Sequence, residues 1–147
     1  MESGGNTGLK KIYEGTLAED AIAIEIDGLN STAKALSIRM TALGTNAGGG
    51  LNIVVNGKQH LFFAGVTAGN IIDYHFQNRV WLWRDGTTLY GRAWMNINQT
   101  VGYYKWDNFN EPIQSLKIFS NYNDGTNKYY GANSKIEIYE GIFPNVM

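Results

Sequence analysis

The sequence predicts an all-β fold, an antiparallel β-sandwich of jelly-roll type with about nine or ten strands. Three observations support this prediction. Apolar and polar residues alternate in several segments, Asn-Gly and Asp-Gly pairs separate such segments, and 18 of the 147 residues are glycine. No internal repeat of blade length is visible, which argues against a propeller.

Length and composition set further limits. The 147 residues fit a single domain, and we expect residues 1–8 to be a flexible linker and residues 9–147 to form one sandwich. The formal net charge is -1 and no basic run occurs, so nucleic-acid binding is not expected. The chain has no cysteine, and its apolar runs are far shorter than the ~20 residues that cross a bilayer, so no membrane insertion is expected.

Two strands are expected in the first third of the chain. Residues 20–27 place isoleucine at every second position, which is typical of a strand with one buried side. Residues 34–43 alternate in the same way through Leu36, Ile38 and Met40. This second segment is also rich in helix formers, but the spacing of two favours a strand over a helix.

A hairpin is predicted around Asn56-Gly57. The pair is flanked by residues 51–55, which are mostly apolar, and by residues 58–63, which end in Leu61, Phe62 and Phe63. Asn-Gly suits a type I′ turn, in which both central residues need a positive φ.

A second hairpin is predicted around Asp85-Gly86, between residues 70–84 and 87–97. A turn at these two residues makes one face of the hairpin an ordinary apolar core face, with Leu82 opposite Leu89. It makes the other face aromatic and cationic, with Trp83 opposite Thr88, Trp81 opposite Tyr90, Arg79 opposite Arg92, and Gln77 opposite Trp94.

The last part of the chain adds more aromatic residues and two strands. Residues 99–112 carry Tyr103, Tyr104 and Trp106 among Gly, Asn and Asp, and indicate a long functional loop or a short irregular strand. Residues 115–120 and 134–139 alternate as strands do.

The aromatic hairpin face is the sharpest functional feature. Three interpretations stay open: contact with another subunit, a second buried layer, or a platform on which a sugar ring stacks. We expect Trp94 to be core, and Trp81 and Trp83 to be contact residues, because the arginines beside them are costly to bury. The candidate ligand- or partner-binding residues are Trp81, Trp83, Tyr90, Arg79, Arg92, Trp94, Tyr103, Tyr104 and Trp106.

No catalytic constellation is visible in the sequence. It has no Gly-x-Ser-x-Gly elbow, phosphate-binding loop or His-Glu-x-x-His pair, and His60 and His75 fall in different hairpins. No spacing pairs two carboxylates for glycoside hydrolysis. Residues 121–127 are oxygen-rich, but a plain turn fits them better than a calcium loop. We therefore expect no enzymatic activity, no metal site and no cofactor.

Two stretches carry a resemblance to a known class of proteins. Ile113 to Ser120 reads IQSLKIFS, and Gly131 to Gly141 reads GANSKIEIYEG. Together they resemble the closing strands of β-sandwich modules in tailed-bacteriophage virions. The upstream segments IEIDGLNSTAKALSIRMTA and LNIVVNG are similar to earlier strands of those modules. The resemblance touches residues 22–57 and 113–141, about half of the chain.

This resemblance implies a non-enzymatic virion protein of tail, receptor-binding or capsid-decoration type, at the surface of the particle. It implies action in host-surface recognition or virion assembly, with a host glycan or other virion proteins as partners. A homo-oligomer is expected, most often a trimer in such modules. The aromatic block from residue 74 to 109 departs from the pattern, where a variable, partner-facing region is expected. The alternative is a carbohydrate-binding module or lectin-like domain unrelated to phages.

Overall fold

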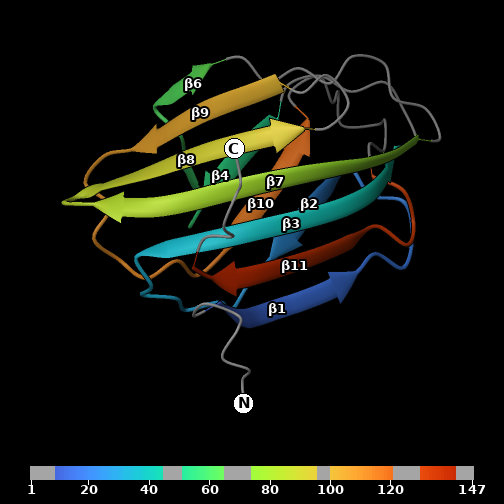
Figure 1. Ribbon diagram of the computed structural model, residues 1–147, viewed down its shortest axis with the longest axis horizontal. Coiled ribbons are helices and arrows are strands. Elements are labelled where there is room, and N and C mark those ends of the chain that lie inside the picture. Colours follow the sequence, from blue (N-terminus) through green and yellow to red (C-terminus); the bar gives the residue numbers. More distant parts are fainter. Residues whose placement is uncertain (1–8, 45–50, 65–73, 96–99, 121–129, 142–147) are drawn as a thin grey trace.

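The computed structural model describes residues 9–44, 51–64, 74–95, 100–120 and 130–141 (Figure 1). In these ranges the chain forms eleven strands and no helix, which confirms the predicted all-β class. The strands are β1 (Lys10–Thr16), β2 (Ala23–Ile26), β3 (Ala35–Gly44), β4 (Leu51–Val55), β5 (Lys58–Gln59), β6 (Phe62–Ala64), β7 (Tyr74–Asp85), β8 (Thr88–Met95), β9 (Thr100–Trp106), β10 (Leu116–Ser120) and β11 (Lys135–Glu140).

The strands form two antiparallel sheets that pack as a sandwich. The larger sheet has the order β1-β11-β3-β7-β8-β9-β6, and the smaller has the order β2-β10-β4-β5. In Figure 1 the larger sheet lies in front, with β4, β10 and β2 behind it. The chain passes repeatedly from one sheet to the other, as in a jelly roll.

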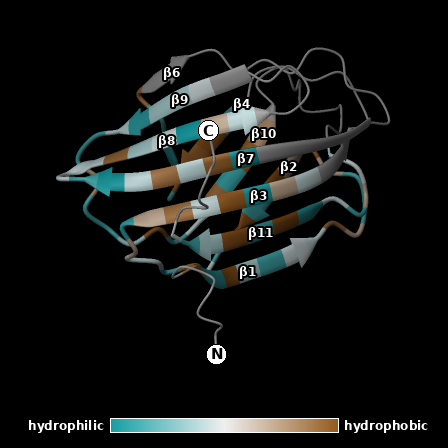
Figure 2. Cartoon of the chain, in the orientation of Figure 1, coloured by the Kyte–Doolittle hydropathy of each residue, from teal (hydrophilic) through white to brown (hydrophobic). Residues whose placement is uncertain are grey.

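The core lies between the two sheets and follows from the alternation of side chains along each strand. Figure 2 shows hydrophobic and hydrophilic bands alternating along β3 and β11. Leu36 and Ile38 of β3 point inward and meet residues of the smaller sheet such as Ile53 and Ile118 in one buried cluster. The isoleucines at positions 24 and 26 are buried as expected. Period-two patterning thus places the core correctly.

Strand β3 confirms the prediction made for residues 34–43 and excludes the helical alternative. All ten of its residues pair with β7, from Ala35 opposite Trp83 to Gly44 opposite Tyr74. This pairing places β3 and β7 side by side at the centre of the larger sheet.

The first predicted hairpin has the expected turn, but its second arm divides. Asn56 and Gly57 have φ angles of 53° and 76°, as a type I′ turn requires. The arm expected over residues 58–63 becomes β5 in the smaller sheet and β6 in the larger one. The change of sheet occurs at His60, whose Nε2 lies 3.0 Å from Asn52 Oδ1, and at Leu61, whose N–H donates to the Lys105 carbonyl at 2.6 Å.

The second predicted hairpin forms with a register that differs by two residues from the prediction. The turn lies at Gly86-Thr87, so Trp83 faces Tyr90, Trp81 faces Arg92 and Arg79 faces Trp94. The reason is that Gly86, with a φ of 62°, takes the first central position, as glycine does in type II′ turns. A shift of two keeps every side chain on its predicted face, because the period of a strand is two.

Two strands were not predicted as such. β1 pairs with β11 from Lys10 to Thr16, with a shift of register at Ile12, and β9, within residues 99–112, is a regular strand between β8 and β6. The segment 121–127 and the side chain of His75 lie outside the described residues. Within the described ranges no cluster of three or more metal-ligating residues occurs. Nor does this part of the chain contain a helix that could cross a membrane.

Candidate functional site

The candidate site is the outer side of β7, β8 and β9 in the larger sheet, the side turned toward the viewer in Figure 1. Its residues alternate along each strand with buried core residues such as Val80, Ala93 and Tyr104. We call this surface the aromatic face. It consists of Arg79, Trp81 and Trp83 on β7, Tyr90, Arg92 and Trp94 on β8, and Tyr103 and Lys105 on β9.

One row of the aromatic face places an arginine between two rings. Trp81, Arg92 and Tyr103 are direct neighbours across the three strands. The guanidinium carbon of Arg92 lies 5.9 Å from the centre of the Trp81 ring and 5.8 Å from the centre of the Tyr103 ring. Both distances fall within the range of cation–π attraction. The rings therefore hold the guanidinium in place.

The rows on either side also contain aromatic rings in contact with a second ring or with an arginine. Trp83 and Tyr90 stack with ring centres 5.7 Å apart and an interplanar angle of 21°. On the other side, the guanidinium carbon of Arg79 lies 5.8 Å from the centre of the Trp94 ring. The prediction that the aromatic and cationic residues of this hairpin share one face is therefore correct in geometry.

The accessibility of the tryptophans differs from the expectation. Trp81 was expected to be a contact residue, but it is only 4% exposed. It lies between Ser37 of β3 and Arg92 of β8, so it is covered from both sides along its row. Trp94 was expected to be core, but it is half-buried, as Trp83 is. Tyr103, which is 45% exposed, is the most accessible aromatic residue of the face.

Tyr104 and Trp106 are corrections to the predicted site. Both point into the core, with exposures of 1% and 2%. Successive residues of β9 point to opposite sides of the sheet, so Tyr103 faces outward while Tyr104 faces inward. The centre of the His60 ring lies 5.0 Å from the centre of the Tyr104 ring and 6.3 Å from that of the Trp106 ring. Burial raises the pKa of the Tyr104 hydroxyl. These two side chains belong to the core and offer no exposed surface on the aromatic face.

The sequence-based candidate set lacked two cations at the margin of the aromatic face. Lys105 lies beside Tyr90, and Arg39 of β3 lies directly opposite Arg79. Arg39 falls on the polar side of the strand predicted at residues 34–43, so the sequence pattern already indicates that it faces outward. Its position relative to Arg79 depends on the pairing of β3 with β7, which no local pattern fixes.

The other half of the outer surface, on β1 and β11, has balanced charges. Lys11 lies 2.8 Å from Glu14 and 3.1 Å from Glu137, and Lys135 lies 3.5 Å and 3.8 Å from the same two carboxylates. The hydrogen bond from Lys11 lowers the pKa of Glu14. These four residues satisfy one another and offer little to a charged ligand.

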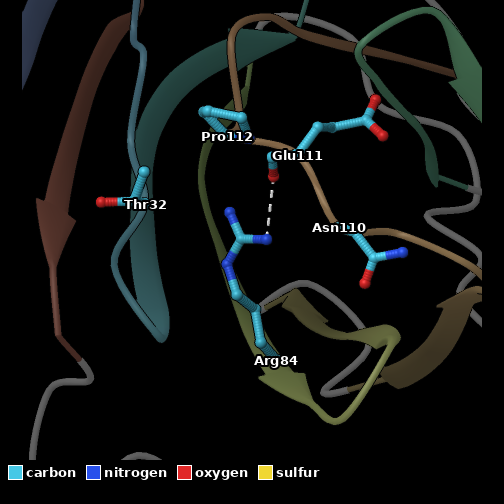
Figure 3. Close-up of a pocket in the computed structure, with 5 residues that line it drawn as sticks. All are labelled: Thr32, Arg84, Asn110, Glu111 and Pro112. Carbon is cyan, nitrogen blue, oxygen red and sulfur yellow. Dashed lines mark hydrogen bonds between the residues drawn. The ribbon is translucent and has the colours of Figure 1, made fainter.

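An open pocket of about 190 Å³ lies at one end of the sandwich, lined by Thr32, Arg84, Asn110, Glu111 and Pro112 (Figure 3). The Arg84 guanidinium donates to the carbonyls of Ala33, Glu111 and Ser31 at 2.9–3.2 Å. The Glu111 carboxylate accepts from Lys58 at 2.9 Å and from Asn56 at 3.1 Å. The bonds from Lys58 and Asn56 lower the pKa of Glu111. The bonds from Arg84 tie the loops at residues 31–33 and 111 to the end of β7. The polar groups here serve the fold.

Comparison with known proteins finds distant structural likenesses. No protein-family model matches the chain, and no curated protein matches its sequence. A tetrameric galectin from the ball sponge Cinachyrella is 8% identical, with 82% of this chain and 99% of that chain covered and a TM-score of 0.39.

Two further solved structures are similar to the chain. Peanut lectin is 9% identical over 97% of this chain and 95% of its own, with a TM-score of 0.39. The CBM2 module of evolved Dit from a Lactobacillus casei phage is 11% identical over 90% of this chain and 78% of its own, with a TM-score of 0.24. At TM-scores this low, these likenesses carry no argument about what the chain does.

Proposed function

We propose that this chain is a non-catalytic β-sandwich module that binds a glycan on its aromatic face. The observation that carries the proposal is the exposed Tyr103 ring beside the Arg92 guanidinium, which the buried Trp81 ring holds from its other side. Flat apolar rings beside hydrogen-bond donors match a sugar ring, which has apolar C–H faces and an equatorial belt of hydroxyls. The exposed ring of Tyr103 offers the stacking surface and the neighbouring Arg92 offers donors.

The exposure pattern favours a glycan over a large protein partner. A stable protein interface buries roughly 800 Å² on each side, with a more apolar patch at its centre. Among the described residues, the large hydrophobic side chains that are exposed are Tyr103 and Leu61. Leu61 lies outside the aromatic face. The accessible apolar area therefore suits a ligand of a few sugar rings.

The resemblance to phage virion modules supports the proposal that this binding takes place at the surface of a phage particle. The resembling segments, residues 22–57 and 113–141, coincide with scaffold strands β2, β3, β4, β10 and β11. The aromatic face lies on β7, β8 and β9, outside both segments. A common scaffold with a chain-specific binding face is the arrangement expected of a receptor-binding part at the surface of a virion. The homotrimer expected for such a part remains a prediction, and a mass measurement by light scattering tests it.

The proposed function is tested with a glycan array and two variants. Tyr103→Ala removes the accessible ring and is expected to abolish binding while folding persists, because the side chain is 45% exposed. Phe119→Ala is the matched control, since Phe119 carries the same kind of ring-and-cation contact, with Lys117 at 5.4 Å, on the smaller sheet. Binding that survives in Tyr103→Ala, or no binding of any glycan by the natural chain, would contradict the proposal.

A further inference from the structure

The outer surface of the larger sheet carries an excess of positive charge on one side. On β1 and β11 the two lysines and two glutamates described above neutralise one another. On the aromatic face and the adjacent strand β3 the charged residues are Arg39, Arg79, Arg92 and Lys105. Of these, Lys105 has a carboxylate nearby, Asp107 at 3.8 Å. For the three arginines the described residues provide no ion-pair partner.

Arg39 and Arg79 form a like-charged pair. They are directly opposite each other in the register of β3 and β7. Like charges in this position destabilise a sheet unless an anion lies between them. The next residue along the row is Glu137, but its carboxylate is engaged by Lys11 and Lys135. An anion bound from outside would remove the repulsion.

Arg84 shows how an arginine is held when it serves the fold. Its guanidinium donates three hydrogen bonds to backbone carbonyls, so its donors are used within the protein. Arg79 and Arg92 are held instead by ring contacts, at 5.8 Å from Trp94 and at 5.8–5.9 Å from Tyr103 and Trp81. A cation–π contact orients the guanidinium without using its N–H groups as hydrogen-bond donors. The Nε of Arg92 is buried, so the terminal Nη groups are the donors that Arg92 offers to an acceptor.

We infer that the glycan bound by the aromatic face is acidic, and that Arg39, Arg79 and Arg92 receive its carboxylate or sulfate group. This inference rests on the proposed function and adds the chemical class of the ligand. The planar guanidinium pairs with two oxygens of such a group through parallel hydrogen bonds. The half-buried Trp94 ring beside Arg79 and the exposed Tyr103 ring beside Arg92 then contact the sugar that carries the acid. A single-stranded nucleic acid is the less favoured occupant, because the sequence has no basic run and three arginines do not make the long basic groove that follows a phosphate backbone.

The test measures the binding of matched acidic and neutral glycans to the whole chain. The probes are uronate oligosaccharides with their methyl esters, sialylated glycans with their asialo forms, and sulfated glycans with their desulfated forms. We expect at least one acidic member to bind about tenfold or more tightly than its neutral partner, since a charge-assisted hydrogen bond contributes about that much. This preference should decrease as the salt concentration rises.

Two variants of Arg79 and one control variant assign the preference to this arginine. Arg79→Gln should lower the ratio of the acidic to the neutral affinity about tenfold, whatever change it makes in the affinity for the neutral partner. Arg79→Lys keeps the charge but loses the bidentate geometry, so it should retain part of the preference. Lys117→Gln, at the ring contact on the smaller sheet, is the control and should change neither affinity.

The outcomes separate this inference from the function on which it rests. If neutral glycans bind as tightly as their acidic partners, or if Arg79→Gln leaves the preference intact, the inference is wrong and the glycan-binding function stands. If no glycan of either class binds, the proposed function itself fails, and the inference fails with it. Tight binding of a thymidine oligonucleotide in place of the glycans would also overturn the inference.

Discussion

Trp83 of β7 and Tyr90 of β8 face each other across the hairpin, with ring centres 5.7 Å apart and ring planes inclined by 21°. This stacked pair exists because the turn lies at Gly86-Thr87. A turn one residue earlier would have placed Trp83 opposite Thr88. The position of one glycine therefore determines which rings and which guanidinium groups become neighbours on the aromatic face.

Tryptophans on the two sides of β7–β9 should differ in their effect on stability. Trp106→Ala should destabilise the fold by about 3–5 kcal/mol, because it leaves a cavity in the core and removes the hydrogen bond from Nε1 to the Lys58 carbonyl. Trp83→Ala should cost about 1–2 kcal/mol, since this side chain is half-buried. Urea unfolding of both variants measures the difference. Equal losses would show that the aromatic face is part of the core.

Gly91 of β8 should not tolerate a side chain. A Cβ at this position would lie 3.1 Å from the Leu82 side chain and 3.2 Å from the Trp106 ring, closer than most Cβ contacts in proteins, so these neighbours would have to shift. Gly91→Ala should therefore destabilise the fold by about 1–3 kcal/mol through overpacking. A thermal melt checks this, and an unchanged melting temperature would mean that Trp106 can shift without loss.

Asn56 has two separable roles. Its φ of 53° suits the turn, and its side chain bonds the Pro112 carbonyl at 2.8 Å and the N–H groups of Gln114 and Ser115 at 2.7 and 3.1 Å. Asn56→Gly keeps the turn but loses these bonds, and should cost about 1–3 kcal/mol.

Asn56→Ala also disfavours the positive φ, and should cost about 1 kcal/mol more than Asn56→Gly. Chemical unfolding of the two variants side by side separates the roles. Equal stabilities of the glycine and alanine variants would argue against a role for the backbone angle.

The pairing of Glu111 with Lys58 should make stability depend on acid pH. The hydrogen bond from Lys58, then that from Asn56, lowers the pKa of Glu111 below its ordinary value of 4.5. A carboxyl group whose pKa falls on folding stabilises the native state above its unfolded pKa, and this contribution is lost as the pH falls through the folded pKa.

The expected result is that Glu111→Gln lowers stability at neutral pH and that the difference from the natural chain shrinks below about pH 4. Lys58→Met should reduce the pH dependence in the same region, because it removes the donor that lowers the pKa. Unfolding curves recorded from neutral to acid pH measure both effects. A difference that stays constant down to the lowest pH would contradict this assignment.

Much of the fold could be predicted from the sequence because its signals are local. The alternation through Leu36, Ile38 and Met40 identifies a strand and its buried side, and Asn56-Gly57 identifies a turn. The passage of the chain from β5 to β6 could not be predicted. It depends on the hydrogen bond from Leu61 to Lys105, a residue more than forty positions away in the sequence.

The candidate site was predictable in composition and less so in detail. The alternation of β7 and β8 places Trp83, Tyr90 and Arg92 on one face whichever of the two turns forms. The burial of Trp81 and the meeting of Arg39 with Arg79 depend on which strand lies beside β7. Strand order in a sheet is a non-local property, so neither feature could be read from the pattern alone.

The central claim, that the aromatic face is the binding surface, is tested most directly by mapping a bound glycan with NMR. Chemical-shift changes are recorded on the labelled chain while the tightest glycan from the array is added. The account predicts that the changes gather at Trp83, Tyr90, Arg92, Trp94 and Tyr103, with little change at Lys117 or Phe119. Changes gathered instead around the pocket at Thr32, Arg84 and Asn110, or on the smaller sheet, would contradict it.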